Sequence, residues 1–289
     1  MDLKPQVKAF FDDATNTVSY VVSDPGTREC VIIDPVLNFD PKAGRTSTVS
    51  AAHIIAYARE HGLKPQWILE THAHADHLSA AQHLKRELGG AIGIGEHIKD
   101  VQKTFSGIFN FEADFRSDGS QFDHLFRDGE TFAIGGIAAR VMHTPGHTPA
   151  CVTYLIGDAA FVGDTLLMPD FGTARTDFPG GDARTLYRSI QAILALPPRT
   201  RVFICHDYGA PDRAEFAWES TVADEYRANI HVKAGVDEDA FVNIRRQKDA
   251  TLGMPTLILP SVQVNIRAGR LPPPEDNGVS YLKIPVNVL

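Results

Sequence analysis

A run of six residues, His-Ala-His-Ala-Asp-His at positions 72–77, restricts what this chain of 289 residues can fold into more than any other feature. Four of the six side chains can bind a metal ion. In a regular strand His77 would point away from the other three, because side chains alternate between the two faces. We therefore expect a loop that leads from a strand into a helix, where all four can turn toward one centre. Imidazole and carboxylate together suit zinc, iron or manganese, whereas calcium and magnesium prefer oxygen ligands alone.

Three more candidate ligands lie downstream, each at or soon after the end of a predicted strand. They are His147 in a Pro-Gly-His turn, Asp164 after a glycine, and His206 after a cysteine. Open sheets place their sites at the carboxyl ends of strands, and glycine permits the sharp turn that such a position needs. Each signal is weak by itself, but the seven residues together predict a metal centre.

The order of the predicted elements is similar in the two halves of the chain. In the first half, strands are expected at 7–11, 17–22, 29–33, 67–70 and 91–94, and helices at 47–60, at 78–88 and from 96. A long loop is expected at 107–129. The second half should contain strands at 131–134, 137–143, 152–156, 160–162 and 201–205 and a helix at 182–195. Helices at 216–229 and 238–249 and an extended tail from 271 follow. This order predicts two β/α halves packed sheet against sheet, with helices outside.

Charge and apolar content limit the function classes. The 36 Asp and Glu residues outnumber the 28 Lys and Arg residues, and the formal net charge of −8 disfavours nucleic acid as a partner. No run approaches the roughly 18 apolar residues of a membrane span, and the N-terminus lacks the apolar segment of a signal peptide, so we expect a cytoplasmic protein without a membrane partner. The cysteines, Cys30, Cys151 and Cys205, fit reduced thiols, and we interpret the last two as small buried hydrophobic residues.

The candidate ligands resemble those of the metallo-β-lactamase superfamily, whose pattern is a His-x-His-x-Asp-His run followed by separate His, Asp and His ligands. The resemblance covers roughly residues 15–210. It implies an α/β fold, an αβ/βα sandwich of two mixed β-sheets with helices on the outer faces. It also divides the chain into a catalytic domain at 1–212 and a helical extension with a tail at 213–289 that completes the substrate pocket. In two-metal members, one ion would bind His72, His74, His147 and bridging Asp164, and the other Asp76, His77, Asp164 and His206.

Residues near the ligands are similar to those of the persulfide dioxygenase branch, also called sulfur dioxygenase. These are Arg-Thr-Asp-Phe at 175–178 and His-Asp-Tyr at 206–208. Glyoxalase II is a hydrolytic relative with different residues at both positions. Near the segment that corresponds to 175–178 it has a Gly-Cys-Gly-type segment before aromatic-Glu-Gly, and at the segment that corresponds to 206–208 it has His-Glu-Tyr. Thr173 stands where the best-known dioxygenases have Cys, so the chain looks closer to a bacterial group of these enzymes.

The resemblance implies an iron(II)-dependent oxidoreductase that adds both atoms of O2 to glutathione persulfide and releases sulfite and glutathione. One Fe(II) per chain would be held by His72, His147 and Asp164, a ligand set that leaves neighbouring positions open for the persulfide and for O2. Four further residues would hydrogen-bond these ligands or bound water: His74, Asp76, His77 and His206.

Other residues are expected to bind the substrate or to brace the ligand loop rather than to hold the metal. Tyr208 would donate a phenolic hydrogen bond into the site, and Arg175 and Asp177 would pair to brace the ligand loop. Glutathione has two carboxylates, so its pocket should offer cations. The densest basic cluster contains Arg245 and Lys248, which we expect near the glycine carboxylate.

Other functions remain open at this point. A binuclear hydrolase like glyoxalase II would use the same ligands to activate water against an acyl-glutathione thioester. A regulatory member would sense a thiol metabolite without turnover, although the complete ligand set argues against it. The acidic charge disfavours a nuclease of the same fold. The apolar residues after 278 are expected to complete the core or to form a subunit contact, and we favour a homodimer.

Overall fold

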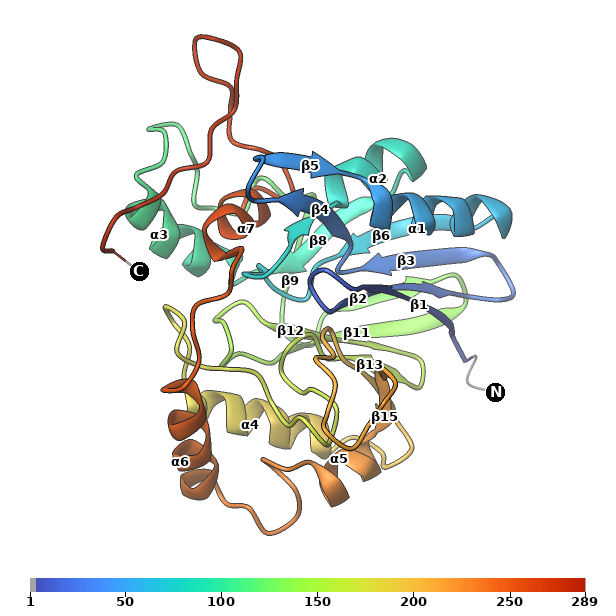
Figure 1. Cartoon of the computed structure of the whole chain (residues 1–289). Helices are drawn as coiled ribbons and strands as arrows, with labels where there is room; N and C mark the ends of the chain where they lie inside the picture. The colour runs from blue at the N-terminus through green and yellow to red at the C-terminus, as the bar shows by residue number, and fades with distance from the viewer. Residues whose placement is uncertain (1–3, 289) are drawn as a thin grey trace.

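The computed structural model describes residues 4–288, which form two six-stranded sheets packed face to face (Figure 1). The first sheet contains, in spatial order, β1 (Gln6–Asp12), β2 (Thr17–Ser23), β3 (Glu29–Ile33), β6 (Lys64–Leu69), β8 (Ala91–Gly95) and β9 (His124–Phe126). The second contains β10 (Thr131–Ile134), β11 (Ile137–His143), β12 (Val152–Ile156), β13 (Ala159–Phe161), β14 (Arg201–Phe203) and β15 (Glu219–Thr221). Each sheet mixes parallel and antiparallel pairs, so the predicted α/β sandwich is confirmed.

Helices cover the outer side of each sheet (Figure 1). Those on the first sheet are α1 (Val49–Glu60), α2 (Ala81–Leu88), α3 (Ile98–Phe109) and α7 (Ile258–Asn265). Those on the second are α4 (Ala183–Leu194), α5 (Val222–Ala228) and α6 (Glu238–Asp249). A small sheet of β5 (Arg45–Ser47), β4 (Val36–Asp40) and β7 (Leu78–Ser79) adjoins the first layer. Among residues 4–288, no helix has the length and apolar character needed to cross a membrane.

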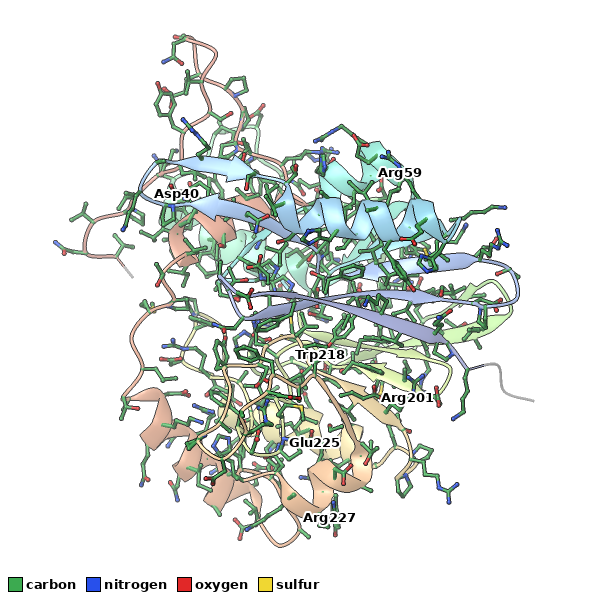
Figure 2. All side chains as sticks on the ribbon, turned by 45° about the vertical axis from the view of Figure 1, so that its right-hand side comes forward. Asp40, Arg59, Arg201, Trp218, Glu225 and Arg227 are labelled. Atoms are coloured by element: carbon green, nitrogen blue, oxygen red, sulfur yellow. The ribbon has the colours of Figure 1, made fainter. Side chains whose placement is uncertain are left out.

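The core between the sheets explains why the central strands are almost entirely apolar. All of β2 is buried, because one face meets the helices and the other meets the second sheet. On that inner face the ring of Tyr20 packs edge-on against Phe161, with 5.3 Å between ring centroids. Toward one end of the interface, Trp218 lies between the layers (Figure 2) and stacks on Phe11 of β1 at 6.1 Å. These contacts hold the two sheets in register.

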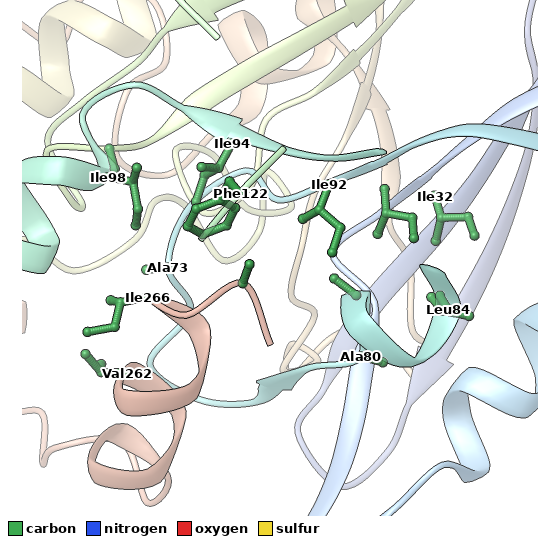
Figure 3. Packing of buried hydrophobic residues seen from close by; sticks show 14 of the residues in the cluster. Ile32, Ala73, Ala80, Leu84, Ile92, Ile94, Ile98, Phe122, Val262 and Ile266 are labelled. Atoms are coloured by element: carbon green, nitrogen blue, oxygen red, sulfur yellow. The ribbon is translucent and has the colours of Figure 1, made fainter. Parts of the chain in front are cut away.

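The second part of the core lies between the first sheet and its helices. There, Ile92 and Ile94 of β8 and Phe122 pack against the helices that cover this sheet (Figure 3). Val262 and Ile266, in and just after α7, contribute to the same cluster. Burying a side chain of this size stabilises the fold by about 1.5–3 kcal/mol. A segment from near the end of the chain is thus part of the first layer.

The structure departs from the expected elements in several places. The segment 78–88 begins with the two-residue strand β7 and becomes helical only at α2, and 216–229 contains β15 before α5. Strands β4, β5 and β9 and helix α7 were not predicted. The short strands depend on partners far along the chain, as in the pairing of Val36 with Ser79. Helix α7 includes Pro260, and it has no polar face to produce a helical pattern because its side chains are mostly buried.

Candidate metal centre

The seven predicted ligands come from both halves of the chain and meet at one edge of the two sheets. The run at 72–77 follows β6, whereas the second sheet contributes His147 after β11, Asp164 after β13 and His206 after β14. One group, His72, His147 and Asp164, has ligand atoms within 4.8 Å of one another. A second group of the same compactness contains His74, Asp76, His77 and His206.

Asp164 lies between the two groups. Its Oδ2 atom is 3.5 Å from Nε2 of His147 and 3.7 Å from Nε2 of His72. Its Oδ1 atom is 3.4 Å from Nε2 of His206. One carboxylate therefore reaches both ligand groups with different oxygens, as a bridging ligand would.

The imidazoles of the first sheet are oriented by Asp34, which directly follows β3. Its Oδ1 atom accepts from Nε2 of His74 at 2.9 Å, so Nδ1 of His74 faces the centre. Its Oδ2 atom accepts the hydroxyl proton of Thr71 at 2.8 Å. That hydroxyl is then an acceptor for Nδ1 of His72 at 3.0 Å, which leaves Nε2 of His72 as the ligand atom.

The other imidazoles are oriented by groups that were not predicted. The Thr17 hydroxyl lies 3.3 Å from Nδ1 of His77 and 3.4 Å from Nδ1 of His206. The backbone oxygen of Arg175 accepts from Nδ1 of His147 at 2.8 Å. In each case the hydrogen bond occupies the nitrogen that faces away from the centre, and Nε2 remains free to bind a metal.

The loop that contains the first four ligands is also held from α7. The side-chain amide of Asn265 donates to the backbone oxygens of His74 and His77, at 2.8 Å each. Its oxygen accepts from the backbone N–H of Ser79, also at 2.8 Å. A single buried side chain thus fixes both ends of the turn.

Buried ligand atoms that form no hydrogen bond test whether the centre fits a metal. Within residues 4–288, six such atoms converge here: Nε2 of His72, Nδ1 of His74, Oδ2 of Asp76, Nε2 of His77, Oδ1 of Asp164 and Nε2 of His206. Leaving a buried polar atom unpaired costs about 1–3 kcal/mol, so six at one point need a common partner. Nitrogen and carboxylate oxygen atoms in this arrangement fit a transition-metal ion or zinc.

The electrostatics of His72 and Asp76 favour the forms that bind metal, whereas at His74 and His206 neighbouring carboxylates outweigh burial and raise the pKa, so a metal would displace a proton there. Burial, together with the neighbouring imidazoles, lowers the pKa of His72 well below its usual value, which keeps the ring neutral. Burial would raise the pKa of Asp76, but His206 and His77 more than offset it and hold that pKa below the ordinary range. Neutral imidazole and ionised carboxylate are the states that donate electron pairs to a cation.

Two glycines let the ligands approach as closely as they do. Gly146, before His147, has φ +134°, and a Cβ atom there would lie 2.3 Å from the backbone of Leu186. Gly163, before Asp164, has φ +54°, and its Cβ would lie 2.6 Å from the Thr71 hydroxyl. Only glycine combines these backbone angles with such close packing, as expected from the sequence.

A cavity of about 840 Å³ opens onto the centre. Asp76, His147 and Asp164 lie in its lining, and most of the surrounding surface is apolar. Tyr208 also lines it, with its ring stacked on His206 at 5.7 Å between centroids. Arg175 and Asp177 form the expected pair, since the Arg175 guanidinium donates to both oxygens of Asp177 at 2.6 and 2.7 Å.

The two expected substrate cations differ in their surroundings, although both line the cavity. Arg245 is only 1% exposed, and its guanidinium is bonded to Asp249 and to the backbone oxygen of Thr173. Lys248 is half-buried, with its ammonium 3.3 Å from the backbone oxygen of Phe171. On β5, Arg45 also lines the cavity; it is exposed and, within residues 4–288, forms no ion pair.

The cysteines match their interpretation as hydrophobic residues. All three are buried, and burial raises the pKa of the Cys30 and Cys151 thiols to about 12. Burial also raises the pKa of Cys205, whose Sγ atom lies within 4.8 Å of ligand atoms of Asp164 and His206. Thiols in this state are poor nucleophiles.

Comparison with known proteins places these observations in a family. The sequence pattern of the metallo-beta-lactamase superfamily matches residues 12–206. A probable metallo-hydrolase of Burkholderia pseudomallei is 57% identical over 98% of this chain and 99% of its own length. A protein named Glyoxylase B2 from Dictyostelium discoideum is 51% identical over 100% of this chain and 99% of its own. The chain spans 65% of the length of a beta-lactamase hydrolase-like protein of Agrobacterium fabrum, which is 55% identical.

Relatives named for persulfide oxidation are more distant but cover most of the fold. The mitochondrial persulfide dioxygenase ETHE1 of Homo sapiens is 32% identical over 91% of this chain and 88% of its own. The crystal structure of ETHE1 from Myxococcus xanthus superposes with a TM-score of 0.72 at 28% identity, covering 92% of this chain and all of that one. With a family match over well more than half of its length, the sandwich fold and the assembled ligand groups, the chain belongs to the metallo-beta-lactamase superfamily.

Proposed function

We propose that the protein is an iron(II)-dependent persulfide dioxygenase that converts glutathione persulfide, O2 and water to glutathione and sulfite, with two protons released. The observation that carries the proposal is the compact group of His72, His147 and Asp164 at the base of a large cavity. Two imidazoles and one carboxylate are the ligands of many oxygenases that use non-haem iron(II). The resemblance to persulfide dioxygenases, in sequence and in fold, points the same way.

Iron(II) bound there would offer adjacent open positions to a persulfide sulfur and to O2 and would supply electrons to O2. The protein's own groups would hold the reactants and move protons. Asp76 lines the cavity, and its Oδ2 atom is 3.1 Å from Nε2 of His206. His206 stabilises the ionised form of this carboxylate, which can therefore accept a hydrogen bond from the persulfide S–H or from water. Tyr208 can donate its phenolic hydrogen to the reacting sulfur or oxygen from the cavity wall.

The cavity suits an elongated thiol with carboxylates near both ends. Lys248 from α6 and Arg45 from β5 both line it and belong to different layers of the fold (Figure 1). Asp164 and His147 line the same cavity. A glutathione moiety, whose sulfur is in the middle of the molecule, could contact both cations while its sulfur reaches the centre. The mostly apolar wall would cover the rest and exclude water.

Oxygen uptake and metal analysis on one sample test this proposal. Iron-loaded protein given glutathione persulfide is expected to consume O2, to produce sulfite, and to contain close to one iron per chain. His72→Ala should remove both the iron and the activity. Protein that is fully iron-loaded yet consumes no O2 would contradict the proposal.

A binuclear hydrolase of acyl-glutathione thioesters is the second candidate. The second ligand group, with Asp164 reaching it through its other oxygen, is the observation in its favour. Relatives named metallo-hydrolase and Glyoxylase B2 support it as well. It requires two metals per chain and hydrolysis of S-lactoylglutathione, and the same metal analysis separates the two candidates.

A further inference from the structure

The segment at 171–177 has neither helical nor strand structure, yet its backbone is held at successive positions. Met168 begins the segment through backbone hydrogen bonds, and several side chains of the extension after residue 213 hold the residues that follow. Asn229 donates to the backbone oxygen of Gly172 at 2.9 Å, and Nδ1 of His231 accepts from the N–H of Thr173 at 3.1 Å. Several of the contacts that fix the segment therefore come from α5, α6 and their connections rather than from a sheet.

A buried ion pair on α6 makes the central contacts. Arg245 and Asp249 are one helical turn apart, with Nη2 of the arginine 2.8 Å from Oδ1 of the aspartate. Nη1 of Arg245 donates to the backbone oxygen of Thr173 at 2.8 Å. Oδ2 of Asp249 accepts from the backbone N–H of Thr176 at 3.1 Å and from its hydroxyl at 3.0 Å. Both side chains are less than a tenth exposed, so these bonds are not exchanged for water.

Arg175 lies between Thr173 and Thr176, the two residues that the ion pair hydrogen-bonds. Its backbone oxygen accepts from Nδ1 of His147 at 2.8 Å. That bond decides which nitrogen of His147 has the proton, and it directs Nε2 toward Asp164. A shift of the segment would release the imidazole to rotate or to change tautomer. The hydrogen bonds that Arg245 and Asp249 make to residues 173 and 176 thus affect His147 through the backbone oxygen of Arg175.

We infer that Arg245 and Asp249 are positioning residues of the metal centre, which hold the Arg175 backbone oxygen where it fixes the ring and tautomer of His147. The inference rests on the proposed role of His147 as a ligand. It assigns to Arg245 a task other than binding a substrate carboxylate, because the guanidinium is already bonded on its buried sides. It also makes the helical extension part of the metal site rather than only a wall of the cavity.

Metal affinity tests the inference without depending on turnover. The affinity of metal-free protein for Co(II) would be measured by competition with a chelator for wild type, Arg245→Gln and Arg246→Gln. Arg246 is the neighbouring residue on α6, is exposed and has no side-chain bond within residues 4–288, so it serves as the matched control. Arg245→Gln is expected to weaken Co(II) binding about 10- to 100-fold, the usual effect of losing a group that orients a ligand, and the control should leave it unchanged.

Two further readouts separate positioning from substrate binding. In the 15N spectrum of the metal-free wild type, His147 should show a single tautomer with Nδ1 protonated, and Arg245→Gln should show a mixture. The KM of the iron-loaded variant for glutathione persulfide should match that of wild type. A raised KM with unchanged Co(II) affinity and an unchanged spectrum would overturn the inference. Arg245 would then be assigned to substrate binding.

Should Arg245→Gln fail to fold, Arg245→Lys decides the question. The ammonium can stay beside Asp249 but cannot also reach the backbone oxygen of Thr173. Weaker Co(II) binding and a tautomer mixture in this variant support the inference, and wild-type values for both contradict it. If wild type binds Co(II) but consumes no O2, the dioxygenase proposal fails while this test still gives its answer.

Discussion

Glu225 of α5 offers a test of how the extension is held together. Its carboxyl is fully buried, and it accepts from Ser220 at 2.6 Å and from Asn229 at 2.8 Å (its position is shown in Figure 2). Burial raises the pKa of this carboxyl from 4.5 to about 7, and the two hydrogen bonds only partly oppose the rise. Asn229 also holds the segment at 171–177, so the state of Glu225 matters to the metal centre.

The sign of the effect follows from proton binding. Between pH 4.5 and about 7 the folded chain keeps a proton on Glu225 that the unfolded chain has lost. The free energy of unfolding therefore falls as pH rises through this window and is constant above it. A pKa change from 4.5 to about 7 corresponds to about 3 kcal/mol, at about 1.4 kcal/mol for each pH unit.

Glu225→Gln removes this linkage while keeping both contacts, because the amide can accept from Asn229 and donate to Ser220. We expect the variant to be as stable as wild type near pH 4.5 and more stable above pH 7 by up to about 3 kcal/mol. Urea unfolding of metal-free protein at several pH values, followed by fluorescence and circular dichroism together, measures the difference. Glu215→Gln, in an exposed side chain, is the control. A difference between Glu225→Gln and wild type that does not change with pH would refute the reasoning.

The remaining predictions concern the centre and the cavity. Asp34→Asn should weaken metal binding about tenfold or more, because it loosens His74 directly and His72 through Thr71. Competition with a chelator measures the affinity, and an unaltered value would contradict the reasoning. Cys205→Ala should retain activity per bound metal, since its thiol is buried and protonated, and near-complete loss of turnover in a metal-loaded sample would contradict this. Arg45→Gln should raise KM for glutathione persulfide about three- to tenfold with kcat unchanged, an effect that shrinks at high salt; equal KM values at low salt would exclude the contact.

The candidate ligands could be recognised in the sequence, whereas the groups that orient them could not. Histidine and aspartate at this density have few structural uses, so their chemistry is visible without coordinates. Asp34 was missed although it offers a weak signal, an Asp-Pro pair directly after an apolar strand, and its φ of +49° marks a backbone under constraint. Thr17 offers none, since it is one threonine in a β-strand until the fold brings it beside His77 and His206.

Charge patterns did not show how the basic residues are paired. Arg245 belongs to the densest basic cluster, which favoured a substrate contact, but an acidic partner four residues later is the spacing of a helical ion pair. The exposed cation of the cavity, Arg45, is isolated in the sequence and becomes relevant only because β5 pairs with β4 at the rim. Long, strongly apolar strands such as β2 and β3 were predicted well because burial on both faces leaves little choice of residue.

The position of α7 in the first layer affects the order in which the fold forms during synthesis. Its residues leave the ribosome after the entire second sheet, although they complete the core beside Ala73 (Figure 3) and the turn that Asn265 holds. A nascent chain that already contains all seven ligand residues therefore has its first four on an unsupported loop. Domains generally fold as units, and this one is complete only when α7 is available. We therefore expect capture of a metal ion to be delayed until α7 docks, so that the growing chain does not bind an ion in a half-formed centre.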